Sequence, residues 1–309
     1  MKNMRKNFTI IIAFVFMGMN ASTSAKGLLG DENIDPKKKE TTQYVVPPHI
    51  PEKLTFSEEE VPLGNFDVRE SLDRELMVNT FFHSQTIRYI KLAPRFFEII
   101  EPILKQEKIP EDFKYLALAE SGFDLKAISP AGAAGIWQFM EATGRENGLE
   151  VNGVVDERYH IEKATKAACK YLHQSYAKYG NWTTVAASYN AGRNGINRQV
   201  ERQKETNYYN LLLSEETNRY VYRILSYKLI LESPEAYGFY VPKKDMYPSI
   251  PVKIVEVKTS VQNLADFSKE HNINYKILKL FNPWLRENYL KNDSGKTYEI
   301  KIPKGRYVE

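Results

Sequence analysis

The segment Phe113-Lys114-Tyr115-Leu116-Ala117-Leu118-Ala119-Glu120-Ser121-Gly122 decides the predicted fold, because its apolar residues recur with the period of a helix. One face of that helix carries, at i, i+3, i+4 and i+7, the residues Phe113, Leu116, Ala117 and Glu120. A carboxyl group therefore falls within an apolar stripe. Desolvation there favours the neutral form and raises the pKa, which a general acid working near neutral pH requires. A glutamate at the end of a stripe, solvated or paired with a lysine, is the alternative interpretation.

Two segments further along the chain carry groups suited to a sugar ligand. The segment 129–140 places small residues before Trp137-Gln138, which offer a stacking face and an amide. Small residues let the backbone approach closely, either to a ligand or to a neighbouring helix. The other segment places Tyr189 and Asn190 at a predicted helix C-terminus, just before a glycine. Packing alone explains both segments equally well, with Tyr189 in the core and Asn190 as a helix stop.

The chain around these segments is also helical in its periodicity. The spacing i, i+3, i+4, i+7 recurs in one stripe formed by Phe96, Ile99, Ile100 and Ile103. Gly180 is placed to end one helix and Asn181 to cap the next. No strands alternate with these helices, so we expect an all-α domain over residues 76–235.

The C-terminal part of the chain changes in character. A break over 236–249 contains several prolines and is predicted to be a linker. Beyond it, residues 252–257 alternate with the period of a strand, two short helical stretches follow, and residues 298–302 form a closing strand. We therefore expect a small βααβ domain over 250–305, and a mainly α fold for the chain as a whole.

The N-terminal 25 residues have the three-part organisation of a secretory signal peptide. Basic residues precede an apolar run over 8–19, and small residues follow it as far as Ala25. The run is shorter than the roughly 20 residues that span a bilayer, so cleavage is favoured over anchoring, and membrane contact is expected only if the leader is retained. We expect a periplasmic or cell-envelope location. Residues 26–75, rich in proline and charge runs, predict a linker or extended arm.

Composition narrows the class of protein further. The 309 residues, 42% of them hydrophobic, suffice for one full domain and a small second one. The formal charge of +4 is spread over interspersed acids and bases, so nucleic acid is not an expected partner. Five scattered histidines lack metal-ligand spacing, and we expect neither a metal nor another cofactor. The single cysteine, Cys169, is predicted to be a small buried residue.

The ordered set of motifs resembles the catalytic domain of the soluble lytic transglycosylase and goose-type lysozyme superfamily, closest to the membrane-bound transglycosylase D branch. The resemblance covers about residues 76–231. Its motifs are Glu120-Ser121, Gly135 to Gln138, Asp156-Glu157-Arg158, Ala167-Ala168, Tyr189 to Gly192, and Glu216 to Val221. Each motif is weak alone, whereas the ordered set is highly specific. It implies a lysozyme-like helical catalytic domain.

The resemblance also implies a role for each matching residue. Glu120 becomes the single catalytic acid/base, with Ser121 as its hydrogen-bonding neighbour. Among the implied cleft residues, Gln138 and Asn190 bind the N-acetyl sugars. Tyr189 positions Glu120 or stabilises the transition state. The same groove is lined by Glu216 and Tyr220. Two positions depart from the pattern of the branch, namely His160-Ile161 in place of Asp-Pro and Glu141 in place of proline. We interpret His160 as a surface or capping residue and not as a base.

The implied activity is cleavage of the bond between N-acetylmuramic acid and N-acetylglucosamine without water, which leaves a 1,6-anhydro end. Peptidoglycan glycan strands are then the substrate, and cell-wall machinery proteins are possible partners. Two alternatives remain open. One is a lysozyme-type hydrolase in which Asp124, Glu141 or Asp156 activates water. The other is an inactive wall-binding protein.

The tail over 250–303 resembles a LysM domain, most clearly in the end of its second helix, Leu280 to Arg286. Such domains bind polymers that contain N-acetylglucosamine. Here the usual Gly-Asp before Thr-Leu, in the first loop that binds sugar, is replaced by Val257-Lys258-Thr259-Ser260-Val261. This departure leaves two roles open for the domain, glycan binding and a mainly structural one.

Overall fold

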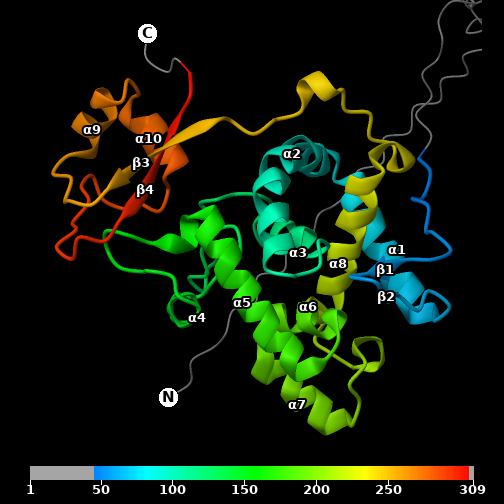
Figure 1. The fold of residues 1–309 in the computed structure, drawn as a ribbon. Coiled ribbons are helices and arrows are strands. Elements are labelled where there is room, and N and C mark those ends of the chain that lie inside the picture. The colour runs from blue at the N-terminus through cyan, green and yellow to red at the C-terminus, as the bar shows by residue number, and fades with distance from the viewer. Residues whose placement is uncertain (1–44, 306–309) are drawn as a thin grey trace, which may run out of the picture. The chain divides into compact units, whose positions relative to one another are not determined.

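The computed structural model of the chain describes residues 45–305. The predicted leader and residues 26–44 of the predicted arm lie outside the described residues. Figure 1 shows helices in most of the described chain, followed by a small C-terminal unit with two long strands. The prediction of a mainly α fold is confirmed.

The helical domain contains eight α-helices and several short 3-10 turns within the described residues. The α-helices are α1 (Phe66–Phe81), α2 (His83–Gln106), α3 (Phe113–Ser121), α4 (Glu141–Glu146), α5 (Ile161–Tyr179), α6 (Trp182–Ala191), α7 (Arg193–Gln203) and α8 (Glu215–Glu232). The 3-10 turns are η1 (Glu157–Tyr159), η2 (Tyr208–Asn210), η3 (Pro234–Tyr237) and η4 (Lys243–Asp245).

Local sequence signals set the boundary between α5 and α6. Gly180 ends α5 in the left-handed conformation, with φ of 68°. The side chain of Asn181 then caps α6 by accepting a hydrogen bond from the backbone N–H of Thr184 at 2.8 Å. Both expected signals are confirmed, and both work by satisfying backbone groups that a helix end leaves unpaired. Cys169 is fully buried on α5, as expected.

The N-terminal edge of the domain differs from the expectation. Helix α1 begins at Phe66, before the expected boundary at residue 76. A short hairpin of β1 (Thr55–Phe56) and β2 (Glu59–Glu60) precedes it. Phe56 is fully buried, with its ring centroid 5.4 Å from that of Phe113 on α3. This segment completes the core through isolated apolar residues that follow no helical period.

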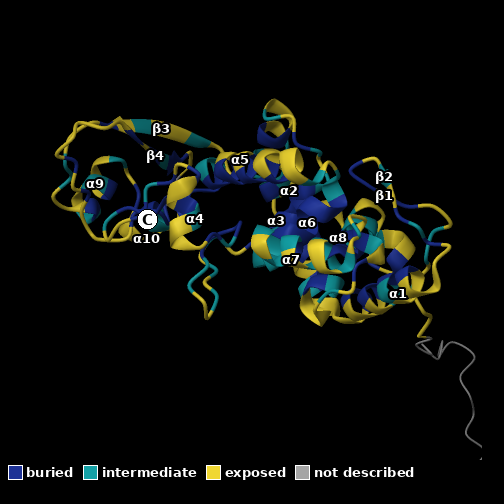
Figure 2. Ribbon diagram, turned by 90° about the horizontal axis from the view of Figure 1, so that it is seen from below, coloured by how far each residue is buried: buried dark blue, intermediate teal, exposed yellow. Residues whose placement is uncertain are grey.

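Helix α3 lies at the centre of the domain. Its residues Phe113 to Leu118 are all buried, and it packs against α2 and α8. Figure 2 shows α6 as another largely buried helix, in dark blue. Because α3 is surrounded on several sides, only its C-terminal end, with Glu120 and Ser121, emerges from the core.

The C-terminal domain has the predicted βααβ order. Strand β3 (Val252–Val257) pairs antiparallel with β4 (Tyr298–Pro303), in the register Val252↔Pro303 to Val257↔Tyr298. Helices α9 (Leu264–Glu270) and α10 (Tyr275–Phe281) lie between them in sequence. Trp284, Leu285 and Ile300 belong to the buried cluster of this domain.

Residues of the helical domain extend that same cluster. Ala134, Val155 and Tyr159 share the core of the βααβ unit. Backbone hydrogen bonds reinforce the contact, with the Asp156 N–H donating to the Trp284 carbonyl at 2.9 Å and the Arg286 N–H donating to the Val154 carbonyl at 2.8 Å. The two domains are therefore joined by a shared core.

Within residues 45–305, no helix is both long and apolar enough to cross a bilayer.

Candidate active site

Glu120 lies in the last turn of α3, where the helix leaves the core. Gly122 ends α3 with φ of 58°, and a Cβ added there would lie 2.8 Å from Tyr89 Oη. Glycine is thus required both by the backbone conformation and by the close approach of Tyr89. This stop places the carboxyl of Glu120 beside α8, on which Tyr220 lies.

Tyr220 and Glu120 are in direct contact. The phenol of Tyr220 donates a hydrogen bond to Oε1 of Glu120. Tyr220 is only 2% exposed, so the phenol has few alternative positions. The interpretation of Glu120 as paired with a lysine does not hold, because its partner is a tyrosine.

The surroundings of Glu120 bring the pKa of its carboxyl close to neutral pH. Burial raises its pKa to about 7, against the lowering effects of the Tyr220 hydrogen bond and the charge of Arg223, while Glu216 contributes to the rise. A carboxyl with this pKa is substantially neutral near pH 7 and can both donate and accept a proton there.

Tyr189 joins the same site from the end of α6. Its phenol donates a hydrogen bond to the carbonyl of Trp137 at 2.7 Å. Burial, followed by the charge of Glu120, raises the pKa of Tyr189 well above its ordinary value. The phenol therefore stays neutral, and α3, α6 and α8 each contribute one of the three side chains Glu120, Tyr189 and Tyr220.

The loop between α3 and α4 carries Trp137 and Gln138. The tryptophan belongs to the core of the helical domain. Trp137 is fully buried and its Nε1 donates to Thr165 Oγ1 at 2.9 Å. The expected stacking face for a sugar is therefore not available. Gln138 has φ of 48°, and its Nε2 donates to the carbonyls of Gly135 at 2.8 Å and Ala127 at 3.2 Å. In this structure the amide nitrogen of Gln138 stabilises the loop.

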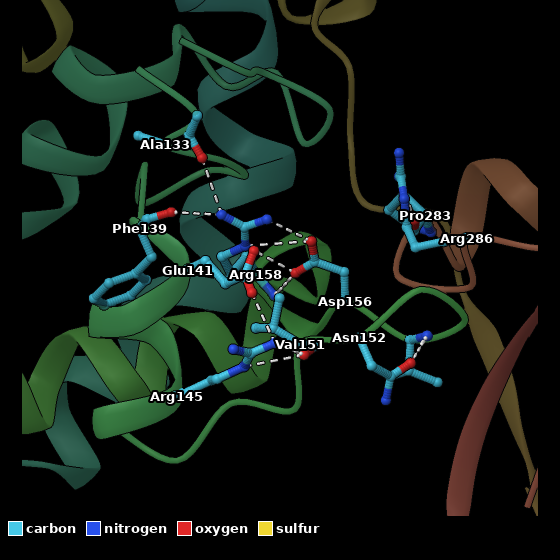
Figure 3. Close-up of polar contacts among 12 residues, drawn as sticks. Ala133, Phe139, Glu141, Arg145, Val151, Asn152, Asp156, Arg158, Pro283 and Arg286 are labelled. Atoms are coloured by element: carbon cyan, nitrogen blue, oxygen red, sulfur yellow. Dashed lines mark hydrogen bonds and ion pairs between the residues drawn. The ribbon is translucent and has the colours of Figure 1, made fainter. Parts of the chain in front are cut away.

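A buried ion pair holds the same loop from its other side. Figure 3 shows the guanidinium of Arg158 between the carboxylate of Asp156 and the carbonyl of Phe139. Arg158 Nη2 lies 2.7 Å from Asp156 Oδ2, and its Nη1 donates to the carbonyls of Gly132 and Phe139 at 3.0 and 3.1 Å. Asp156 is thus committed to Arg158 and is poorly placed to activate a water.

The other carboxylates considered for a hydrolase have partners of their own. Glu141 pairs with Arg145 at 2.7 Å, a contact also drawn in Figure 3, and its side chain is half exposed. Asp124 Oδ1 accepts the N–H of Lys126 at 2.8 Å. No hydrogen bond links any of them to Glu120 within the described residues.

The remaining expected residues occupy mixed positions. Asn190 Oδ1 accepts a hydrogen bond from Thr217 Oγ1 at 3.0 Å, next to Glu216 on α8. Glu216 is 62% exposed and lies 3.3 Å from Arg223. Ser121 donates to the carbonyl of Ala117 at 3.0 Å, one turn back on α3, so the expected bond to Glu120 is replaced by a bond within the helix.

His160 is not a surface residue. It is 6% exposed, and its ring centroid lies 5.7 Å from that of Trp284 in the C-terminal domain. It occupies the N-cap position of α5 but makes no side-chain capping bond. It packs between the two domains, and its Nδ1 lies 3.2 Å from Oε2 of Glu162. Within residues 45–305, no cluster of three or more histidine, cysteine or acidic side chains is arranged to hold a metal ion.

Sequence reasoning missed Arg223, whose charge acts on Glu120, and Glu75, which pairs with Arg223. Arg223 lies three residues after Tyr220 on α8, and Glu75 on α1 is 1% exposed and pairs with it. The i, i+3 spacing from Tyr220 is the signal that could have indicated Arg223. Glu75 fell within the segment that we expected to be an arm, so no local pattern indicated it.

Comparison with known proteins identifies two families along the chain. Residues 98–212 match the transglycosylase SLT domain family, and residues 253–306 match the soluble lytic transglycosylase C-terminal LysM-like domain. The chain therefore combines an SLT transglycosylase domain with a C-terminal LysM-like domain.

The chain is homologous to the membrane-bound lytic murein transglycosylase D of two strains of Escherichia coli. It is 28% identical to each over 257 residues, which cover 81% of this chain and 55% of the relative. The chain thus spans about half the length of these relatives. The X-ray structure of the lytic transglycosylase Slt from Pseudomonas aeruginosa, an inactive mutant, aligns with a TM-score of 0.40 at 20% identity, covering 58% of this chain and 33% of that one.

Proposed function

We propose that the chain is a peptidoglycan lytic transglycosylase with Glu120 as its single acid/base. The observation that carries the proposal is the partly buried, tyrosine-bound Glu120, whose pKa of about 7 suits proton transfer in both directions. The homology to a lytic murein transglycosylase supports the substrate class. The cell envelope is the corresponding location.

In the first step, the neutral Glu120 protonates the oxygen that links N-acetylmuramic acid to N-acetylglucosamine. The bond from that oxygen to C1 of the muramic acid breaks, and the N-acetylglucosamine leaves as an alcohol. The 2-acetamido oxygen of the muramic acid stabilises the cationic C1, in place of a protein nucleophile. The hydrogen bond from Tyr220 stabilises the carboxylate that Glu120 has become.

In the second step, the Glu120 carboxylate accepts the proton of the C6 hydroxyl on the same sugar. O6 then bonds to C1 and closes a 1,6-anhydro ring, and Glu120 regains its starting protonation state. No water is consumed. General acid/base catalysis of this kind contributes roughly 10²–10⁴-fold, so sugar distortion and dipoles along the groove must supply the rest.

The test compares the full chain with Glu120→Gln on isolated peptidoglycan, with soluble muropeptides identified by mass spectrometry. Anhydro ends released only by the wild type would support the proposal. Hydrated reducing ends would instead indicate a lysozyme-type hydrolase. Sedimentation with the wall without release by either protein would indicate a binding protein. The Glu120→Gln variant keeps the side-chain shape and should still bind glycan.

For the LysM-like domain, we propose glycan binding at the loop over residues 257–261, which departs from the family pattern. This loop lines a hollow of about 440 Å³ together with Asn263, Asp266 and Phe267. Amide, carboxylate and aromatic groups in one hollow suit an N-acetyl sugar. Titration of Glu120→Gln with N-acetylglucosamine oligomers, with and without Phe267→Ala, tests this site apart from catalysis. Equal affinity in both proteins would favour a structural domain.

A further inference from the structure

Helix α8 presents a positive charge on the face that holds Glu120. Tyr220 and Arg223 are three residues apart and therefore project from the same face of the helix. Arg223 Nη1 lies 3.3 Å from Oε1 of Glu216, about two turns back along α8. Glu216, Tyr220 and Arg223 thus lie on one face of α8, and Tyr220 on that face hydrogen-bonds the carboxyl of Glu120.

Glu75 on α1 is a buried partner of the Arg223 guanidinium. It is 1% exposed, and its Oε2 lies 3.7 Å from Arg223 Nε. Its Oε1 lies 2.5 Å from Nε of Arg219, which is one turn before Arg223 on α8. A buried carboxylate is stable only when paired, so the two arginines and Glu75 fix one another. Arg223 therefore has a buried partner in Glu75 and an exposed one in Glu216.

We propose that Arg223 is a positioning residue of the active site, which Glu75 and Glu216 hold so that its positive charge stabilises the ionised form of Glu120. The inference rests on the proposed function, because that mechanism makes the Glu120 carboxylate an intermediate. The groups facing Glu120 are the neutral phenols of Tyr220 from α8 and Tyr189 from α6, the positive Arg223 and the negative Glu216. From α2, the guanidinium of Arg88 donates to the carbonyl of Gly122 at 3.0 Å. Arg223 is the cation whose charge lowers the pKa of Glu120.

The two carboxylates on Arg223 limit its effect. An unpaired cation beside Glu120 would favour the ionised form so strongly that the general acid would lose its proton before reaction. Sharing the guanidinium between Glu75 and Glu216 weakens that pull, and Glu216 itself opposes it by raising the pKa of Glu120. The arrangement suits an acid that must be neutral before the first step and ionised after it.

The test is an NMR titration of the Glu120 carboxyl in the full chain, labelled with carbon-13 at glutamate carboxyls. The Glu120→Gln variant identifies the signal by deleting it. Arg223→Gln should raise the pKa of Glu120, changing its neutral-to-ionised ratio near pH 7 roughly threefold or more. Arg223→Lys keeps the charge and should restore most of the wild-type titration.

Arg219→Gln is the matched control, because Arg219 pairs with the same Glu75 but is not among the groups that shift the pKa of Glu120. It should lower the melting temperature and leave the titration of Glu120 unchanged. An unchanged titration in Arg223→Gln, or equal shifts in both variants, would overturn the proposal. If Arg223→Gln does not fold, Glu216→Gln provides the second test, since Glu216 is exposed. Removing this charge should lower the pKa of Glu120, and a constant pKa would also overturn the inference.

Activity provides an independent measurement. The alkaline limb of muropeptide release should move to higher pH in Arg223→Gln and stay in place in Arg219→Gln. A wild-type chain that releases no muropeptides would refute the proposed function. The NMR titration would still decide the role of Arg223, so the two failures are distinguishable.

Discussion

The phenol of Tyr220 on α8 donates a hydrogen bond to the carboxyl of Glu120 on α3, across 100 residues of sequence. This contact couples the acid to a helix that packs against α3. Burial raises the pKa of Glu120, whereas the hydrogen bond lowers it, and the balance lies at about 7. The phenol thus opposes desolvation and keeps the acid within reach of neutral pH.

Tyr220→Phe removes this hydrogen bond while preserving the ring. We expect the rate of muropeptide release to fall roughly ten- to a hundredfold, since a hydrogen bond to a charged group contributes about 1.5–3 kcal/mol. The alkaline limb of the pH profile should move upward, because the Tyr220 hydrogen bond no longer lowers the pKa of Glu120. Tyr222→Phe, on the same helix and equally buried, is the control. A wild-type rate and pH profile in Tyr220→Phe would show that the contact has no catalytic role.

Glu120→Gln should stabilise the protein at neutral and alkaline pH. The pKa of Glu120 is about 7 in the folded state and 4.5 ordinarily. The folded state therefore binds the proton more tightly, and stability is lost as the pH rises from about 4.5 to about 7. Glutamine avoids this loss. We expect a gain on the order of 1–3 kcal/mol above pH 7 and little difference near pH 4, measured by urea unfolding. A gain that is the same at both pH values would contradict the raised pKa.

Local signals predicted the parts of the fold that depend on nearby residues. Gly180 and Asn181 fix a helix boundary through backbone conformation and one capping bond, and both are visible in sequence. The βααβ order likewise follows from a change of hydrophobic period between 252 and 303. The apolar stripe ending at Glu120 predicted a desolvated carboxyl, which agrees with its raised pKa.

Tertiary contacts decided the parts that the sequence left open. Trp137 offers an aromatic face only in principle, since its indole is enclosed by the core. His160 is polar but becomes buried when Trp284, far away in sequence, packs against it. The role of Glu75 depends on its ion pairs with two arginines on α8. None of these partners lies within a helical turn, so no periodic pattern could indicate them.

Gly135→Ala should be strongly destabilising. A Cβ at this position would lie 1.9 Å from the carbonyl oxygen of Arg158, and the backbone has φ of 79°. Both clash and backbone strain oppose alanine, so we expect a loss of roughly 3 kcal/mol or more in the free energy of unfolding. Gly132→Ala is the control, because its φ is 87° but nothing lies within 4 Å of the added carbon. It should cost only about 1 kcal/mol from strain. Similar losses in both variants would mean that the close approach at Gly135 is unimportant.

Glu162→Gln should weaken the junction between the two domains in a pH-dependent way. Burial acts to raise the pKa of Glu162, but the hydrogen bond with His160 and the charge of Lys301 on β4 lower it to about 2. The folded pKa lies below the ordinary 4.5, so the carboxylate contributes stability above about pH 4.5 and loses it as the pH falls toward 2. Because the side chain is 31% exposed, we expect a cost of only about 1–2 kcal/mol at pH 7.

Urea unfolding of wild type and Glu162→Gln between neutral pH and about pH 3 checks this prediction. The cost of the substitution should shrink steadily as the pH falls below about 4.5, since the wild type then loses the same ion pair. Glu299→Gln is the control, because Glu299 is exposed on β4 and forms no ion pair within the described residues. Its effect should be close to zero at every pH. A cost for Glu162→Gln that does not change with pH would show that the side chain acts through packing and not through its charge.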